Sequence, residues 1–234
     1  MNWKDIQVSE DSTNFVIDGK PIFNKSFIEV LKFHSPGLAP VKDISGSYHI
    51  DISGKEIYPE RYSRTFGYYC GRAAVVKEDQ WFHLNESGER AYNDSFNWVG
   101  NFQEELCTVR DKNNSYYHIN LDGKKTYSEK YIYSGDFKDG IACVKTLTGK
   151  FKHIDRNGKL INDKDFLDLG VFHKGYATAK DERGWFHIDK LGNPIFNQRY
   201  LMVEPFYNGF ALVTNYDNSK VIINEKGENI LNLK

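Results

Sequence analysis

A glycine recurs along the chain at intervals of 34 or 35 residues. The seven positions are Gly19, Gly54, Gly88, Gly123, Gly158, Gly192 and Gly227. Self-similarity at such a period predicts a tandem array of small structural units, each of which buries its apolar face against its neighbours. Since the series extends over most of the 234 residues, the sequence predicts about seven units and leaves no room for an unrelated second domain.

The residues before this glycine predict a β-hairpin in each unit. The residue three positions earlier is Asp or Asn in six of the seven units, as in Asp155-Arg156-Asn157-Gly158. An Asp or Asn side chain opens a turn by accepting backbone N–H groups, and a glycine three residues later adopts the positive φ that closes it. The segment entering the turn alternates apolar and other residues, as at Tyr48/Ile50 and Phe186/Ile188, which is typical of a strand.

A second strand and an aromatic segment complete each repeat. The strand has the pattern G-x-A-x-V, as in Gly140-Ile141-Ala142-Cys143-Val144. We expect the aromatic segments to fill the joints between successive units. One aromatic column consists of Phe33, Tyr68, Phe102, Phe137, Phe172 and Phe206.

These patterns predict an all-β fold in a single domain spanning residues 1–234. It would contain about seven antiparallel units of 34 or 35 residues, ending near residues 23, 58, 92, 127, 162, 196 and 231. We favour an open, twisted, solenoid-like array, because the units are short and no exchange of strands between the termini is evident. The alternative is a closed β-propeller, which the unit count would allow.

The repeat resembles a known family. The pattern G-x-A-x-V…W-x-x-I-D-x-x-G-K, followed by an aromatic segment, is similar to the WG β-repeats of many bacterial proteins, and residues 175–196 and 140–161 match it best. The chain is a divergent example, because Phe82 and Phe186 occupy the position of the glycine that follows the tryptophan. The resemblance implies an all-β array that binds other molecules, without implying a mechanism.

Five of the seven histidines occupy one column, five residues before the repeating glycine. They are His49, His83, His118, His153 and His187. Such a column could form a metal ladder or a pH-sensitive stripe. We favour a structural role, in which each histidine donates to a backbone carbonyl or a turn Asp of its own unit. The end units carry Asn14 and Ile222 instead, as expected where a structural contact is no longer needed.

The histidines share their strand face with a column of aromatic residues two positions earlier. That face could bind a small molecule or a carbohydrate, and its candidate ligand-binding residues are Trp81, His83, Tyr116, His118, Trp185 and His187. We favour packing between units for the aromatic rings, because a repeat array needs large apolar side chains at its joints.

Composition limits the classes of partner. Thirty-one Lys and Arg residues oppose 32 Asp and Glu residues, so the net charge of −1 does not favour nucleic acid or anionic membranes. The three cysteines are too few for a disulfide framework, and they form no CxxC pair for zinc. Without a signal-like or membrane-spanning segment, we expect a cytoplasmic protein, with signal-independent export left open.

No nucleophile elbow, HExxH, Walker loop or GxGxxG motif occurs in a suitable context, so we predict that the protein is not an enzyme. We predict no catalytic residue, metal or cofactor. The favoured function is a non-catalytic module that binds or scaffolds a protein partner. The alternative is small-molecule or carbohydrate binding through the aromatic and histidine face. The sequence does not define the oligomeric state.

Overall fold

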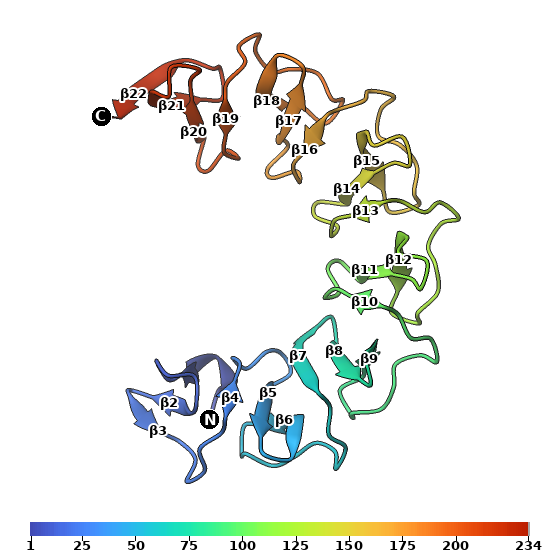
Figure 1. Cartoon of the computed structure of the whole chain (residues 1–234). Coiled ribbons are helices and arrows are strands. Elements are labelled where there is room, and N and C mark those ends of the chain that lie inside the picture. Colours follow the sequence, from blue (N-terminus) through green and yellow to red (C-terminus); the bar gives the residue numbers. More distant parts are fainter. Residues whose placement is uncertain (234) are drawn as a thin grey trace. The chain divides into compact units, whose positions relative to one another are not determined.

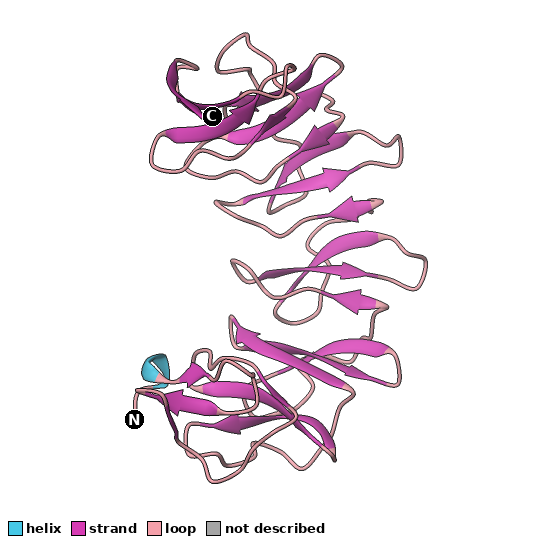
Figure 2. Ribbon diagram, turned by 60° about the vertical axis from the view of Figure 1, so that its left-hand side comes forward, coloured by secondary structure: helices cyan, strands magenta, loops and turns pink. Residues whose placement is uncertain are grey.

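A computed structural model of the chain describes residues 1–233; Lys234, the last residue of the predicted domain, lies outside the described part. The strands form seven small antiparallel sheets that follow one another along the chain (Figure 1). Apart from these strands, the regular structure of residues 1–233 is limited to one short 3-10 helix, η1 (Trp3–Asp5), near the N-terminus (Figure 2).

Each sheet uses a consecutive set of strands, and we number the sheets 1 to 7 in chain order. Sheets 1 to 3 contain β1 (Gln7–Val8), β2 (Phe15–Ile17) and β3 (Lys20–Pro21); β4 (Glu29–Val30), β5 (Leu38–Asp43) and β6 (Gly46–Asp51); and β7 (Arg64–Tyr69), β8 (Arg72–Lys77) and β9 (Gln80–Leu84). Sheets 4 and 5 contain β10 (Trp98–Val99), β11 (Leu106–Arg110) and β12 (Tyr116–Asn120); and β13 (Tyr133–Ser134), β14 (Ile141–Lys145) and β15 (Phe151–Asp155). Sheets 6 and 7 contain β16 (Asp168–Leu169), β17 (Ala177–Asp181) and β18 (Gly184–Ile188); and β19 (Met202–Val203), β20 (Phe210–Thr214), β21 (Lys220–Asn224) and β22 (Asn229–Leu233).

The prediction of an all-β tandem array of about seven antiparallel units is confirmed. Sheet 1 consists of β1 to β3 and sheet 7 of β19 to β22, so each end of the chain completes a sheet of its own. The chain divides into two compact units. The first comprises Met1–Asn114 and His118–Lys125, and the second comprises Ser115–Tyr117 and Thr126–Lys234. None of the described residues belongs to a helix long and apolar enough to cross a membrane.

The G-x-A-x-V pattern forms the middle strand of its sheet, as β14 shows. Ala142 and Val144 are fully buried, while Cys143 pairs with His153 on β15. The small residues of this column are buried in sheets 2 to 7. They are Ala39, Ala73, Cys107, Ala142, Ala177 and Ala211. A strand that is buried on both faces leaves room for only a small side chain where the next sheet approaches.

The turn at the repeating glycine is built as the sequence predicts. Oδ1 of Asp155 accepts hydrogen bonds from the backbone N–H groups of Asn157 and Lys159, both at 2.9 Å, and Gly158 has a φ of 79°. The strand that leaves this turn is shorter than expected, because it pairs at a single bridge, Ile154 with Leu160. Only the end sheets extend this segment into the strands β3 and β22.

Beyond the bridge, the chain carries an aromatic side chain onto the glycine of the next repeat. Tyr58 lies so close to Gly88 that a Cβ added to this glycine would overlap the tyrosine ring. The ring of Phe196 also lies close to Gly227, since a Cβ added to this glycine would be only 2.8 Å from Cγ of the ring. The repeating glycine is therefore required both for its positive φ and for the close approach of the preceding unit.

This double requirement predicts a difference between two glycine substitutions. Gly88→Ala should lower the free energy of unfolding by about 2–4 kcal/mol, because it combines left-handed strain with overlap against Tyr58. Gly19→Ala should lower it by only about 1 kcal/mol, since Gly19 has a φ of 73° and nothing within 4 Å of an added Cβ. Urea denaturation of both variants measures the difference, and equal losses would contradict the role given to the tyrosine contact.

Candidate functional site

The histidine column is buried. His49, His83, His118 and His187 have no exposed surface, and His153 is 2% exposed. In four of these residues the structure shows Nε2 within hydrogen-bond distance of the carbonyl oxygen seventeen residues later. The pairs are His49 with Phe66 (2.8 Å), His83 with Gly100 (2.9 Å), His153 with Gly170 (2.8 Å) and His187 with Glu204 (2.8 Å).

The expectation that each histidine bonds within its own unit is wrong for these four residues. His187 lies on β18 of sheet 6, whereas Glu204 directly follows β19 of sheet 7. The imidazole of His187 also packs on the ring of Phe206, with 4.1 Å between ring centroids. The histidine reaches forward because the following unit supplies a carbonyl that belongs to no strand ladder, and such a group needs a partner when it is buried.

The second ring nitrogen has a partner in only some repeats. Because Nε2 donates to the carbonyl, Nδ1 is the acceptor, and the hydroxyl of Tyr58 donates to Nδ1 of His49 at 2.5 Å. Tyr92 plays the same part for His83. The equivalent residues are Asn162 and Phe196 in the repeats of His153 and His187, and there Nδ1 is buried without a hydrogen bond to the described residues.

Burial keeps these imidazoles neutral. Desolvation lowers the pKa of His49, His83 and His153 to about 4, and it also lowers the pKa of His187. The hydrogen bond to the backbone carbonyl opposes this shift in each case but is the smaller effect. A neutral ring that donates through Nε2 is the form that the joint requires.

The aromatic members of the predicted ligand face are half-buried, and each ring faces another side chain. Trp81 stacks on Phe66 at 5.4 Å between centroids. Nζ of Lys180 lies 5.7 Å from the ring centroid of Trp185. Tyr116 lies 6.1 Å from Tyr133.

The structure therefore divides the six predicted residues into two groups. His83, His118 and His187 are buried, whereas Trp81, Tyr116 and Trp185 remain partly accessible. Ligand binding by these residues stays a prediction. Among residues 1–233, no three or more His, Cys, Asp or Glu side chains are grouped so that they could hold a metal ion.

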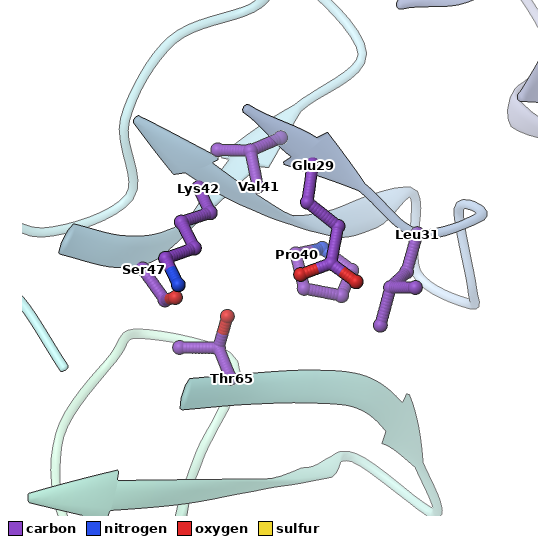
Figure 3. Close-up of a pocket in the computed structure, with 7 residues that line it drawn as sticks. All are labelled: Glu29, Leu31, Pro40, Val41, Lys42, Ser47 and Thr65. Atoms are coloured by element: carbon purple, nitrogen blue, oxygen red, sulfur yellow. The ribbon is translucent and has the colours of Figure 1, made fainter. Parts of the chain in front are cut away.

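A cavity of about 190 Å³ lies in the first compact unit, where sheet 2 meets the beginning of β7. Its lining residues include Glu29, Leu31, Lys42, Ser47 and Thr65. Figure 3 shows a smaller pocket that shares these five residues with the cavity, and in it Glu29 and Lys42 are directed into the space above Thr65. The sequence analysis missed this site, although it contained a signal. Ser47 is a small residue in the column that holds Trp81, Tyr116, Phe151 and Trp185 elsewhere.

Comparison with known proteins agrees with the repeat pattern. The family model described as "WG containing repeat" matches residues 50–81 and 185–218. The resemblance to the WG repeat that the sequence shows is therefore confirmed in these two regions. A search of curated proteins gave no match.

Two solved structures share the fold. The computationally designed Ika8 protein has a TM-score of 0.55 and 10% identity, over 97% of this chain and 83% of its own. BamB from Moraxella catarrhalis has a TM-score of 0.52 and 10% identity, over 94% of this chain and 76% of its own. At this identity the likeness shows the fold alone.

The unequal pairing of Nδ1 predicts opposite effects for two conservative substitutions. Phe196→Tyr should raise the free energy of unfolding by about 1 kcal/mol, because its hydroxyl would reach Nδ1 of His187. The geometry supports this, since the ring centroids of His187 and Phe196 lie 5.8 Å apart, close to the 5.9 Å between His83 and Tyr92. Tyr92→Phe should lower the free energy of unfolding by about 1–3 kcal/mol by leaving Nδ1 of His83 unpaired. Denaturant titration of both variants tests the assignment, which fails if Phe196→Tyr is destabilising.

The lowered histidine pKa values predict that acid weakens the fold. Between pH 6.5 and about 4 the unfolded chain binds protons that the buried rings of His49, His83 and His153 do not. Stability is therefore fully present above pH 6.5 and falls as the pH drops, by up to about 1.4 kcal/mol per pH unit for each histidine. Urea denaturation at a series of pH values measures the slope, and His153→Gln should reduce it. A free energy of unfolding that stays constant over this range would contradict the account.

Proposed function

We propose that the protein is a non-catalytic repeat module that binds a protein partner, and that the second compact unit carries the binding surface. The observation behind the proposal is a row of exposed apolar side chains at one repeated position. Ile132, Leu167 and Leu201 are 46%, 40% and 46% exposed, respectively. We call these three residues the aliphatic row.

The aliphatic row follows from the repeat geometry. Each of its residues directly precedes the edge strand of its sheet, and these strands are β13, β16 and β19 (Figure 1). The backbone N–H groups of the row donate to the carbonyls of Lys145, Lys180 and Thr214, at 2.8–2.9 Å. These bonds hold the backbone against the middle strand while the side chains point outward. Three successive sheets therefore present an apolar group at the same place.

Two further exposed apolar side chains are the sequence neighbours of members of the row. Tyr133 is 46% exposed and Met202 is 59% exposed, and each directly follows a member of the row. A contiguous apolar patch on a protein surface is typical of a protein interface, whereas single exposed apolar residues are common and carry no such meaning. The equivalent positions of the first unit are Ile28, which is 57% exposed, and the polar residues Ser63 and Asn97, so the run of three successive apolar members lies in the second unit.

The near-zero net charge supports a protein as the partner, rather than nucleic acid or a membrane surface. The proposal includes a cytoplasmic location, because three cysteines are too few for a disulfide framework. The alternative, a ligand site on the aromatic and histidine face, has less support. Its histidines lie inside the joints, and a ligand could reach them only if a joint opened.

The proposal predicts that the aliphatic row is needed to retain a partner. The triple variant Ile132→Asp, Leu167→Asp and Leu201→Asp should lose a protein that the unchanged chain retains in stoichiometric amount, because charged groups at an apolar interface are costly to desolvate. Affinity purification of the tagged full chain followed by quantitative mass spectrometry measures this loss.

The matched control replaces exposed leucines outside the row. Leu147→Asp and Leu191→Asp change residues that are 79% and 66% exposed, and this double variant should retain the partner. Circular dichroism of both variants verifies that each remains folded. Equal retention of the partner by the folded triple variant and the wild type would refute the assignment of the row.

A further inference from the structure

A cross-strand pair of a lysine and an aromatic residue recurs in the repeats. Lys145 on β14 pairs with Phe151 on β15, and its Nζ lies 5.0 Å from the ring centroid. Lys180 on β17 pairs with Trp185 on β18 in the same register, at 5.7 Å. An ammonium group above an aromatic face is attracted by the negative potential of that face. The repeat therefore forms a slot in which a ring fits beneath a lysine.

Sheet 2 has the lysine of this pair without the ring. Lys42 on β5 pairs with Ser47 on β6, in the register that joins Lys180 to Trp185. The cavity of about 190 Å³ described above occupies this place. A water molecule takes up about 30 Å³ of liquid, so the space exceeds what one or two waters would fill. Its volume suits a ligand built on a single ring.

The walls of the cavity match the two faces of a planar ring. Leu31 supplies apolar surface, and Lys42 supplies an ammonium group equivalent to the one that lies above the aromatic ring in sheets 5 and 6. In sheet 3 the ring of Trp81 rests on Phe66, and Leu31 takes the place of this phenylalanine in sheet 2. Aliphatic contact on one face and a cation on the other favour an aromatic ring over a saturated one.

The rim of the cavity provides hydrogen-bond donors for an anion. The hydroxyls of Ser47 and Thr65 line it; these residues are 4% and 8% exposed, and neither hydroxyl forms a hydrogen bond with the described residues. Arg64 also lines the cavity, and its guanidinium carbon lies 5.2 Å from the ring centroid of Phe66. Lys42 and Arg64 outnumber Glu29, so the local charge is positive. A carboxylate is the group that two hydroxyls and an arginine bind well.

We propose that this cavity binds a small aromatic carboxylate. The ring occupies the place of the missing aromatic side chain beneath Lys42, and the carboxylate accepts hydrogen bonds from Arg64 and from the hydroxyls of Ser47 and Thr65. No covalent step is involved. This site lies in the first compact unit and shares no residue with the aliphatic row. The proposal of ligand binding is therefore independent of the proposed protein-binding function.

The test is a titration of the full chain, labelled with nitrogen-15, with phenylacetate, followed by NMR. We expect saturable shifts of the backbone amide signals of Lys42, Ser47 and Thr65, with a dissociation constant on the order of 1 mM or lower. Phenylacetamide lacks the negative charge of phenylacetate and so tests the contribution of the carboxylate. Cyclohexylacetate keeps the carboxylate but has a saturated ring and so tests the contribution of the aromatic face. Each should bind at least about fivefold more weakly than phenylacetate.

Three variants assign the binding to the cavity. Ser47→Trp refills the slot with the side chain that two other repeats carry there, as Trp81 and Trp185, so it should fold and should abolish binding. Lys42→Gln should weaken binding at least about fivefold. Lys145→Gln is the matched control, because its slot is already filled by Phe151, and it should bind phenylacetate as tightly as the wild type.

Several results would overturn the proposal. They are the absence of saturable shifts in the wild type, equal binding of cyclohexylacetate, and equal binding by Lys42→Gln. Undiminished binding by folded Ser47→Trp would overturn it as well. If Ser47→Trp does not fold, the comparison of Lys42→Gln with Lys145→Gln still decides the question.

Discussion

The hydrogen bond from a buried histidine to a carbonyl of the next repeat is the constraint on which the array depends. Each sheet has only three or four strands, too few to enclose an apolar core alone. The sheets must therefore pack on one another, and the carbonyls of the connecting segments are buried as they do so. His153 satisfies Gly170, and its ring also packs on Phe172, at 4.5 Å between centroids. One side chain thus provides both polar and apolar contact across the joint.

Much of this architecture could be predicted from the sequence, because local turn chemistry and strand alternation define it. The Asp155 to Gly158 turn and the buried G-x-A-x-V strand form as the residue types require. The direction of the histidine bonds could not be predicted. The acceptor is a backbone carbonyl seventeen residues away, which carries no residue signature. Its position depends on the path of the connecting segment, which the repeat period alone does not give.

The candidate sites show the same limit. The residues of the aliphatic row recur after Tyr131, Phe166 and Tyr200, so their periodicity is visible in the sequence. Their exposure is not visible, because an aliphatic residue beside a strand is as often buried. Ser47 stands out among aromatic residues, yet the cavity beside it exists only because β7 brings Arg64 and Thr65 to its rim. The cavity is created by contact between consecutive repeats, whereas sequence columns describe repeats one at a time.

Buried and exposed positions of the repeat have different roles. The imidazole rings in the joints are neutral and enclosed, and each donates Nε2–H to a carbonyl of the next repeat, which stabilises the fold. Departures from the repeat at exposed or unfilled positions provide room for recognition. The central claim is the protonation state of the joint histidines, and long-range proton–nitrogen NMR correlation of their rings tests it most directly. At pH 6.5 the rings of His49, His83, His153 and His187 should be neutral, with the proton on Nε2 and slow exchange of that proton. Charged rings, or a proton on Nδ1, would contradict the account.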